Sequence, residues 1–296
     1  MGMNRIKTSI EPYTIRDGKS FRLKHVNPDD TGRFRLDKRA ASEALTEGVE
    51  RLRALQEKLY AQDQWGVLLV FQAMDAAGKD GAIEHVMSGV NPQGCDVHSF
   101  KQPSTLELDH DFLWRSTIRL PERGRIGIFN RSYYEEVLIV RVHPEILERQ
   151  RLPESLVTRD IWKERHRDIN AFEAYLARNG YLIRKFFLHI SKKEQTARFE
   201  KRLDEPEKNW KFSLADVQEQ QHWREYMAAY EDTIRQTSTP HAPWVVVPAN
   251  KKWFARWVVA AAIVDALEGL DLAFPRLSPA KKREIAEGRR LLARSK

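Results

Sequence analysis

Residues 66–81 read GVLLVFQAMDAAGKDG, and this stretch decides the fold. Gly66 to Phe71 is a short apolar run with β-branched residues, which predicts a buried strand. The polar loop that follows contains Gly78 and Lys79, and a helix is predicted at 82–90. A strand, a glycine-containing loop and a helix in this order form the setting of a phosphate-binding loop, where backbone N–H groups and a lysine hold phosphate.

The rest of the chain alternates predicted strands with predicted helices. Further strands are expected at 95–100, 125–129, 181–190 and 244–247, and helices at 39–64, 106–118, 154–179, 192–203, 214–235 and 253–267. Gly180 suits the C-terminal cap of the helix before it. This alternation predicts an α/β fold with a five-stranded parallel sheet between helices, and ligands of such sheets bind at the carboxyl ends of the strands.

Composition narrows the class of protein and its compartment. The 296 residues carry a net charge of +8, which indicates an anionic partner such as nucleic acid, a phosphate polymer or a membrane surface. Cys95 is the single cysteine, so no intramolecular disulfide forms, as expected for the cytoplasm. The most apolar stretch, 257–267, has about half the length needed to span a bilayer, and no membrane partner is expected.

The phosphate loop departs from the usual GxxxxGK[ST] pattern at two positions. Ala73 replaces the first glycine, and Asp80 replaces the Ser or Thr that commonly contacts magnesium. Asp75 adds a second carboxylate, so Asp75 and Asp80 together with phosphate oxygens predict a Mg²⁺ site that Mn²⁺ also fits. The alternative is a glycine-containing turn in which Asp80 merely caps the following helix.

Several unusual strings resemble the polyphosphate kinase 2 family. They are QAMDAAGKDG (72–81), VNPQGCDVHSFKQPS (90–104), DHDFLWR (109–115), IFNRSYYEEVLIVRVH (128–143), KFFLHISKKEQ (185–195) and WREYMAAYED (223–232). The resemblance covers roughly residues 35 to 265. It implies a P-loop kinase fold with a helical lid, and transfer of a phosphoryl group between inorganic polyphosphate and a nucleotide.

The resemblance also implies a domain plan and a substrate range. An N-terminal extension (1–34) precedes the phosphotransferase domain (35–270), whose lid lies at about 192–235, and a basic tail (271–296) follows. The FNRS form with Glu135 resembles the subgroup called class III, which implies action on AMP and ADP, with ATP as product, or on the guanine counterparts. Family members are often dimers or tetramers, so a homo-oligomer is expected, with 39–64 as a candidate interface.

Five residues are expected to be catalytic: Asp75, Lys79, Arg131, Arg198 and Arg202. Lys79 neutralises the transferring phosphate, Asp75 holds the metal, and the three arginines stabilise charge in the transition state. Asn130 stands where many family members carry Asp, which shifts metal binding onto Asp75. The residues expected to bind substrate are Ala76, Ala77, Gly78, Asp80, Gly81, Lys101, Arg115, Asn130, Ser132, Glu135, Lys208 and Lys211.

The arginines and Glu135 each have a plainer alternative. Arg198 and Arg202 share a helix face, but a charged, solvated face has the same spacing. Arg131 also suits a surface pair with Glu135 or Glu136. Glu135 is expected to lie near the acceptor's phosphates and to influence the choice of AMP over ADP; the alternative is a salt bridge to Arg131 or Arg141.

Two other functions share part of this pattern. A nucleoside or nucleotide kinase that uses ATP has the same loop and lid but needs less basic surface. A P-loop-derived nucleic-acid binder has only the basic tail in its favour, where residues 276–296 hold eight Lys or Arg against two Glu. The sequence contains no RNP-like string, zinc-finger spacing or helix-turn-helix signature, so no nucleic-acid partner is expected.

Trp114 is expected to be a core residue.

Overall fold

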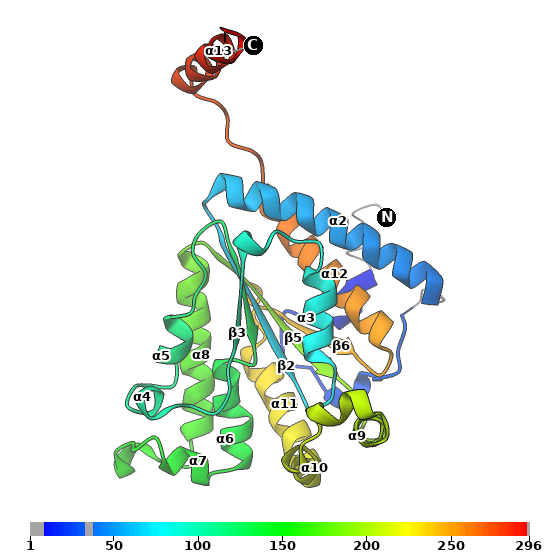
Figure 1. The fold of residues 1–296 in the computed structure, drawn as a ribbon. Coiled ribbons are helices and arrows are strands. Elements are labelled where there is room, and N and C mark those ends of the chain that lie inside the picture. The colour runs from blue at the N-terminus through cyan, green and yellow to red at the C-terminus, as the bar shows by residue number, and fades with distance from the viewer. Residues whose placement is uncertain (1–8, 33–37, 295–296) are drawn as a thin grey trace.

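A single mostly parallel sheet organises the molecule. The structure, a computed structural model, describes residues 9–32 and 38–294 (Figure 1). Its strands, within these ranges, are β1 (Thr14–Ile15), β2 (Gly66–Ala73), β3 (Cys95–Ser99), β4 (Ile126–Asn130), β5 (Tyr181–His189) and β6 (Trp244–Pro248). The order across the sheet is β1-β6-β5-β2-β4-β3. β2 pairs in parallel with β5 and β4, so Phe71 lies opposite both Phe186 and Asn130.

The five predicted strands are confirmed, but the sheet has a sixth. β1 pairs antiparallel with β6 and was missed because two residues offer no alternating pattern. It lies in the segment predicted as an N-terminal extension, so two residues of that segment form one edge of the sheet. The predicted boundary between residues 34 and 35 lies outside the described residues.

Helices cover both faces of the sheet. One face packs against α2 (Lys38–Gln62), α3 (Lys79–Met87) and α12 (Lys252–Glu268). The other packs against α8 (Ile161–Arg178), α11 (Trp223–Thr237) and the 3₁₀ helix η4 (Tyr133–Val137). α12 is buried on nearly every side because it packs against both the sheet and α2. None of the described helices has the length and apolar character needed to cross a membrane.

Shorter elements lie at the edges of the domain. The further α-helices are α4 (Thr105–Leu108), α5 (Trp114–Thr117), α6 (Ile139–Val142), α7 (Glu145–Glu148), α9 (Lys192–Asp204), α10 (Leu214–Glu219) and α13 (Pro279–Arg294). The further 3₁₀ helices are η1 (Glu11–Tyr13), η2 (Leu23–His25), η3 (Pro92–Gly94), η5 (Glu154–Leu156), η6 (Pro206–Lys211) and η7 (Gln220–His222). Figure 1 shows α13, in the predicted basic tail, projecting away from the rest of the domain.

Three predicted helices have the wrong extent. The helix at 106–118 is divided into α4 and α5, because the Asp111 carboxylate accepts the Leu113 N–H and turns the chain between them. The helix at 154–179 begins only at Ile161, since the residues just before it are exposed and have no apolar face to pack. The helix at 214–235 is interrupted by η7 between α10 and α11. Gly180, with φ +81°, is confirmed as a left-handed residue after α8.

Candidate active site

The phosphate loop runs from the carboxyl end of β2 to the start of α3. Ala76 (φ +61°) and Gly78 (φ +92°) adopt left-handed backbone conformations in it. Gly78 is the N-cap of α3, and the helix begins at Lys79. The alternative in which Asp80 is the N-cap is therefore wrong. The first N–H groups of a helix have no intrahelical partner, so this helix start is suited to an anion.

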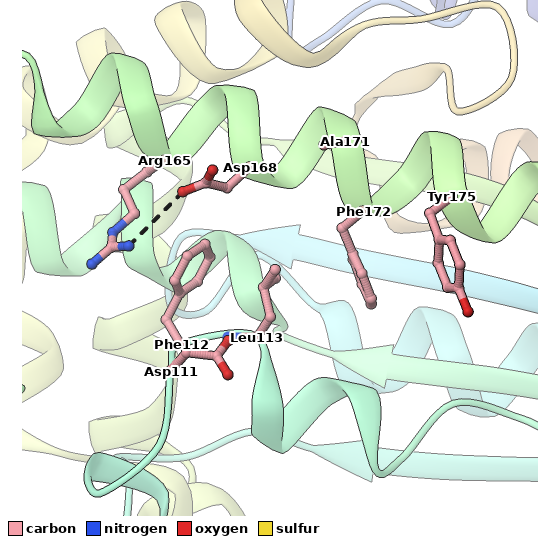
Figure 2. A pocket seen from close by; sticks show the side chains of 8 residues that line it. All are labelled: Asp111, Phe112, Leu113, Arg165, Asp168, Ala171, Phe172 and Tyr175. Atoms are coloured by element: carbon pink, nitrogen blue, oxygen red, sulfur yellow. Dashed lines mark hydrogen bonds and ion pairs between the residues drawn. The ribbon is translucent and has the colours of Figure 1, made fainter.

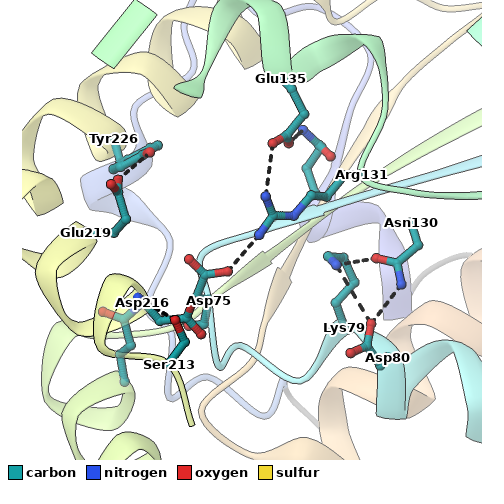
Figure 3. A network of polar contacts seen from close by, with 12 residues as sticks. Asp75, Lys79, Asp80, Asn130, Arg131, Glu135, Ser213, Asp216, Glu219 and Tyr226 are labelled. Atoms are coloured by element: carbon teal, nitrogen blue, oxygen red, sulfur yellow. Dashed lines mark hydrogen bonds and ion pairs between the residues drawn. The ribbon is translucent and has the colours of Figure 1, made fainter. Parts of the chain in front are cut away.

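Lys79 is oriented by the end of the neighbouring strand β4. Its Nζ donates to Asn130 Oδ1, and Asn130 Nδ2 donates to Asp80 Oδ1 at 2.8 Å (Figure 3). Lys79 Nζ also lies 3.9 Å from Asp80 Oδ1. Burial lowers the pKa of Lys79, while Asp80 opposes that shift. A phosphate at this position adds the negative charge that a buried ammonium needs.

Arg131 joins the phosphate loop to the segment after β4. Its backbone is left-handed (φ +63°), and its N–H donates to the Phe71 carbonyl at the end of β2 (3.0 Å). Its guanidinium donates to Asp75 Oδ1 at 2.8 Å and to Glu135 Oε2 at 3.3 Å (Figure 3). The pair between Arg131 and Glu135 that the sequence left open is thus present. Arg141 instead pairs with Asp232, at 2.5 Å.

The two candidate metal ligands have different partners. In Figure 3, Asp75 lies on the Arg131 side of the loop and Asp80 on the Asn130 side. Among the described residues nothing donates a hydrogen bond to Asp75 Oδ2. Burial raises the pKa of Asp75, with Arg131 opposing and Asp216 adding to the rise. Oδ2 is therefore available as a ligand, and a nearby cation would offset the burial that disfavours the charged carboxylate. Both features make Asp75 a suitable cation ligand.

The available ligands favour a metal that is held partly by carboxylates of the protein and partly by phosphates of the substrate. No group of three or more His, Cys, Asp or Glu residues in the described parts of the chain is arranged to hold a metal. Mg²⁺ commonly keeps several waters and binds through one or two carboxylates plus substrate phosphates. Asp75, with Asp80 across the loop, fits that requirement and does not fit a metal cage made of protein alone.

A cavity of about 490 Å³ opens beside Arg131. This is the size range of small-molecule sites. Its lining includes Lys101, Arg115, Arg131, Glu135, His143 and Arg149. Lys101 and Arg115 are therefore brought together, and Arg115 donates to the Lys101 carbonyl at 2.8 Å. His143 and Arg149 were missed, although both follow the RSYYEEV string closely enough to be candidates.

Ser132, expected to bind substrate, also lines this cavity but is fully buried. Its Oγ accepts the Tyr134 N–H at 3.1 Å and so caps η4. The hydroxyl therefore has a local structural partner, and its contact with substrate remains a prediction.

A second hollow, of about 410 Å³, lies between α8 and the segment before α5 (Figure 2). It shares Asp111 and Phe112 with the larger cavity. Phe112 lines both hollows, and the Arg165 guanidinium lies over its ring at 4.6 Å from the centroid. Trp114, expected in the core, is only partly buried and stacks on His110 at 3.9 Å between ring centroids. The helix it starts is too short to bury it.

Arg198 donates hydrogen bonds to the phosphate loop and to the segment after β6. Its Nη1 donates to the Ala76 and Ala77 carbonyls, at 3.0 and 2.7 Å, and its Nη2 to the Ala249 and Asn250 carbonyls, at 2.7 and 3.0 Å. Its Nε donates to a side chain one turn earlier on α9, and only 8% of Arg198 is exposed. In this arrangement the donors of Arg198 are used by protein acceptors, so its direct contact with substrate stays a prediction.

The rest of the predicted lid is arranged differently. Arg202 donates to the Lys211 carbonyl at 3.1 Å and pairs with Asp216 at 3.2 Å. Lys208 pairs with Glu205, and the Lys211 ammonium lies over the exposed Trp210 ring at 4.8 Å. Arg202 thus links α9, η6 and α10, while Arg198 one turn earlier contacts the phosphate loop and the segment after β6.

Known proteins share both this sequence and this fold. Residues 35–274 match the family described as polyphosphate kinase 2. The chain belongs to the polyphosphate kinase 2 family. Its relatives include the ADP-polyphosphate phosphotransferase of Rhodopseudomonas palustris, 51% identical over 97% of this chain and 99% of that protein. Another is the AMP/ADP-polyphosphate phosphotransferase of Meiothermus ruber, 46% identical over 94% of this chain and all of that protein.

Among solved structures, the polyphosphate kinase 2 of Arthrobacter aurescens superposes with a TM-score of 0.84 at 40% identity. The match covers 93% of this chain and 95% of that one. Together with the sheet order, this places the chain among polyphosphate kinase 2 proteins with a P-loop kinase-like α/β fold.

This polyphosphate kinase 2 chain also has a cluster of cations of which sequence analysis predicted one member, Lys208. We call Lys201, Lys208, Lys252 and Arg256 the cation cluster. Burial lowers the pKa of Lys252, and Arg198 and the other three members of the cluster lower it further. The Arg256 guanidinium lies beside Gly81, within 3.7 Å of the position that a Cβ would occupy. The signal available was the i, i+4 spacing of Lys252 and Arg256 in the first turns of a helix that follows a strand end.

Proposed function

We propose that this protein transfers a phosphoryl group reversibly between inorganic polyphosphate and a nucleoside mono- or diphosphate. One observation carries the proposal. The site around the phosphate loop and Lys79 combines a nucleotide-sized cavity beside Arg131 with the cation cluster, in which Lys252 lies among several other cations. A phosphoryl donor and a nucleotide acceptor therefore each have a place, and the names of the two relatives agree with this pair of substrates.

Phosphoryl transfer requires the protein to position the two substrates and to neutralise the charge of their phosphates. A terminal phosphate oxygen of the acceptor attacks the terminal phosphorus of the polyphosphate, and a new P–O bond forms. The bridging P–O bond breaks, and its electron pair remains on the bridging oxygen of a chain one unit shorter. Lys79 and the N–H groups at the start of α3 hold the transferring group, while Arg131 offers a forked donor to the developing charge.

Asp75, supported by Asp80, would hold Mg²⁺ or Mn²⁺ in this site. Such an ion neutralises the phosphate oxygens and orients them. Asp75 Oδ1 accepts a hydrogen bond from Arg131, so Oδ2 is the carboxylate oxygen that would be left to hold such an ion.

The cavity beside Arg131 would receive the acceptor, AMP or ADP or a guanine counterpart. Glu135 enters it with both carboxylate oxygens held, Oε1 by Gln72 at 2.9 Å and Oε2 by Arg131. A fixed carboxylate near the acceptor's phosphates repels a longer, more negative acceptor. Glu135 is therefore our candidate for the residue that favours AMP over ADP.

The cation cluster would hold the polyphosphate donor, together with Lys211 and Arg202. A polyanion needs several cations along its length, and these lie on α9, η6 and the first turns of α12. Arg198 would act as a positioning residue for the loop and not as a phosphate ligand. We further expect a homo-oligomer with α2 at an interface, which light scattering of the purified protein tests.

The decisive experiment supplies polyphosphate as the only phosphoryl donor. Purified protein with ADP or AMP, polyphosphate and Mg²⁺ should form ATP or ADP, and a Lys79→Met variant should not. A second reaction offers ATP and AMP without polyphosphate. Product in the second reaction but none in the first would replace the proposal with an ATP-dependent nucleotide kinase.

A further inference from the structure

A charged pair lies inside the domain, away from the phosphate loop. Lys185 on β5 and Glu173 on α8 are both fully buried, and Lys185 Nζ lies 2.6 Å from Glu173 Oε2. Burial lowers the pKa of Lys185, and Glu173 opposes that shift. The functions proposed above assign nothing to this pair, although two buried charges are an unusual component of a core.

Two tyrosines complete the polar contacts of the pair. Glu173 Oε1 accepts from the hydroxyls of Tyr133 and Tyr134, at 2.9 and 2.8 Å. Lys185 Nζ donates to the Tyr134 hydroxyl at 2.9 Å and to the Thr237 carbonyl at 2.7 Å, which uses all three of its protons. We call Lys185, Glu173, Tyr133 and Tyr134 the buried network. Every polar group in it has a partner, so its geometry is fully specified.

The buried network is directly connected to the candidate site through the chain. Tyr133 and Tyr134 begin η4, two and three residues after Arg131, and Glu135 follows them. The Tyr133 hydroxyl is bonded to α8 and the Tyr134 hydroxyl to both α8 and β5. Arg131, Tyr133 and Glu135 all line the cavity. The segment is short and tightly turned, so a shift of these rings moves Arg131 and Glu135 as well.

The composition of the network favours a positioning role over simple stabilisation. A buried ion pair is commonly no more stabilising than well-packed apolar residues of the same volume. Directional hydrogen bonds constrain geometry more than apolar contacts do, because they fix the position of the hydroxyl end of each ring. Arg131 has a left-handed backbone, a conformation that persists only where its surroundings hold it.

We propose that the buried network is a positioning device that fixes Arg131 and Glu135 in the acceptor cavity, so that its loss changes rate and acceptor choice. This rests on the proposed function, in which Arg131 serves the transferring phosphate and Glu135 the choice between AMP and ADP. Neither Lys185 nor Glu173 touches the substrate. Both act through the two tyrosine rings.

The test removes the two hydroxyls and keeps the ion pair. Tyr133→Phe/Tyr134→Phe retains the ring volumes, and Tyr134→Phe alone is the milder variant if the double variant folds poorly. We expect kcat to fall tenfold or more, since displacement of about 1 Å at a reacting group costs up to 10²-fold in rate. The ratio of kcat/KM for AMP to that for ADP should shift in the same direction as in Glu135→Gln.

The matched control is Leu59→Ala in α2, a fully buried residue that packs on the opposite face of the sheet. It lowers the melting temperature without touching the cavity, so its kcat and its acceptor ratio should stay within twofold of the wild-type values. In a Glu135→Gln background the tyrosine substitutions should leave the acceptor ratio unchanged, because the side chain through which they act on that ratio is altered.

The outcomes separate this inference from the proposed function. A wild-type protein without polyphosphate-dependent activity contradicts the proposed function. An active wild type, with folded tyrosine variants that keep both kcat and the acceptor ratio, overturns the positioning role. Equal losses in Leu59→Ala and in the tyrosine variants would assign the network to stability alone.

Discussion

Replacing Arg198 with lysine tests whether the hydrogen bonds from Arg198 to the phosphate loop hold that loop in position. The guanidinium bridges two pairs of carbonyls, Ala76 with Ala77 and Ala249 with Asn250. A lysine keeps the charge but has one nitrogen, which reaches one of these pairs and leaves the other without a donor. Each hydrogen bond to a charged group contributes about 1.5–3 kcal/mol, so the loss of two amounts to roughly 3–6 kcal/mol.

This loss should appear in both stability and rate. We expect Arg198→Lys to lower the free energy of unfolding by about 3 kcal/mol, measured by denaturant titration, because part of the loss is relieved by loop movement. The loop that carries Asp75 and Lys79 then loses its defined position, and kcat for ATP formation from ADP and polyphosphate should fall about 10²-fold. A coupled luciferase assay measures this rate.

Arg202→Lys is the matched control, one helical turn further along α9. Its contacts are with Lys211 and Asp216 in the predicted lid, so it should leave stability within about 0.5 kcal/mol and act mainly on KM for polyphosphate. Unchanged stability with a hundredfold loss of kcat in Arg198→Lys would mean that Arg198 contacts phosphate directly. Unchanged stability and unchanged kcat would refute the anchoring of the loop altogether.

Four further predictions concern the site. Lys79→Met should lower kcat by about 10³-fold or more without lowering the melting temperature, because burial already disfavours the charge; a folded variant above about a tenth of wild-type turnover contradicts this. Asp75→Asn should raise the Mg²⁺ concentration needed for half-maximal rate. Burial raises the pKa of Asp75 above 3.8, so kcat/KM should be lost as the pH falls through a value above 3.8. Activity that survives EDTA would argue against a role for the metal. Glu135→Gln should change the AMP-to-ADP ratio of kcat/KM about tenfold, equal to about 1.4 kcal/mol, whereas a purely structural salt bridge leaves the ratio unmoved. Lys252→Glu should raise KM for polyphosphate about tenfold and leave KM for nucleotide unchanged. Added NaCl should raise KM for polyphosphate more steeply than KM for nucleotide, since salt screens charges over about 8 Å at physiological ionic strength.

The strand order along the chain and the phosphate loop could be read from local sequence. The apolar run at 66–71, the glycine at 78 and the helix after it are neighbours in the chain, so their relation does not depend on any distant residue. The five parallel strands were predicted for the same reason, since each is an apolar run between helical segments. Arg131 was correctly placed at a strand end beside the loop, because the carboxyl ends of parallel strands meet at one edge.

Side-chain partners across the fold could not be read in this way. Periodicity reports which face of a helix is buried but not what that face meets, so Arg198 has the same pattern whether it faces a substrate or a row of carbonyls. The sheet register decided that it reaches Ala76 and Asn250, which are 122 and 52 residues away in the chain. β1 was missed for a related reason, because two residues form a strand only where β6 offers a free edge.

The sequence by itself determined the phosphate loop, the parallel sheet and the family, because each depends on residues adjacent in the chain. Only the tertiary structure decided that Asn130 bridges Lys79 and Asp80, and that Lys252 lies with Lys201. It also decided that Lys185 is buried with Glu173 and not exposed on an edge. The physical reason is that a charge is stable in a core only beside a specific partner, and the packing of helices on the sheet selects that partner.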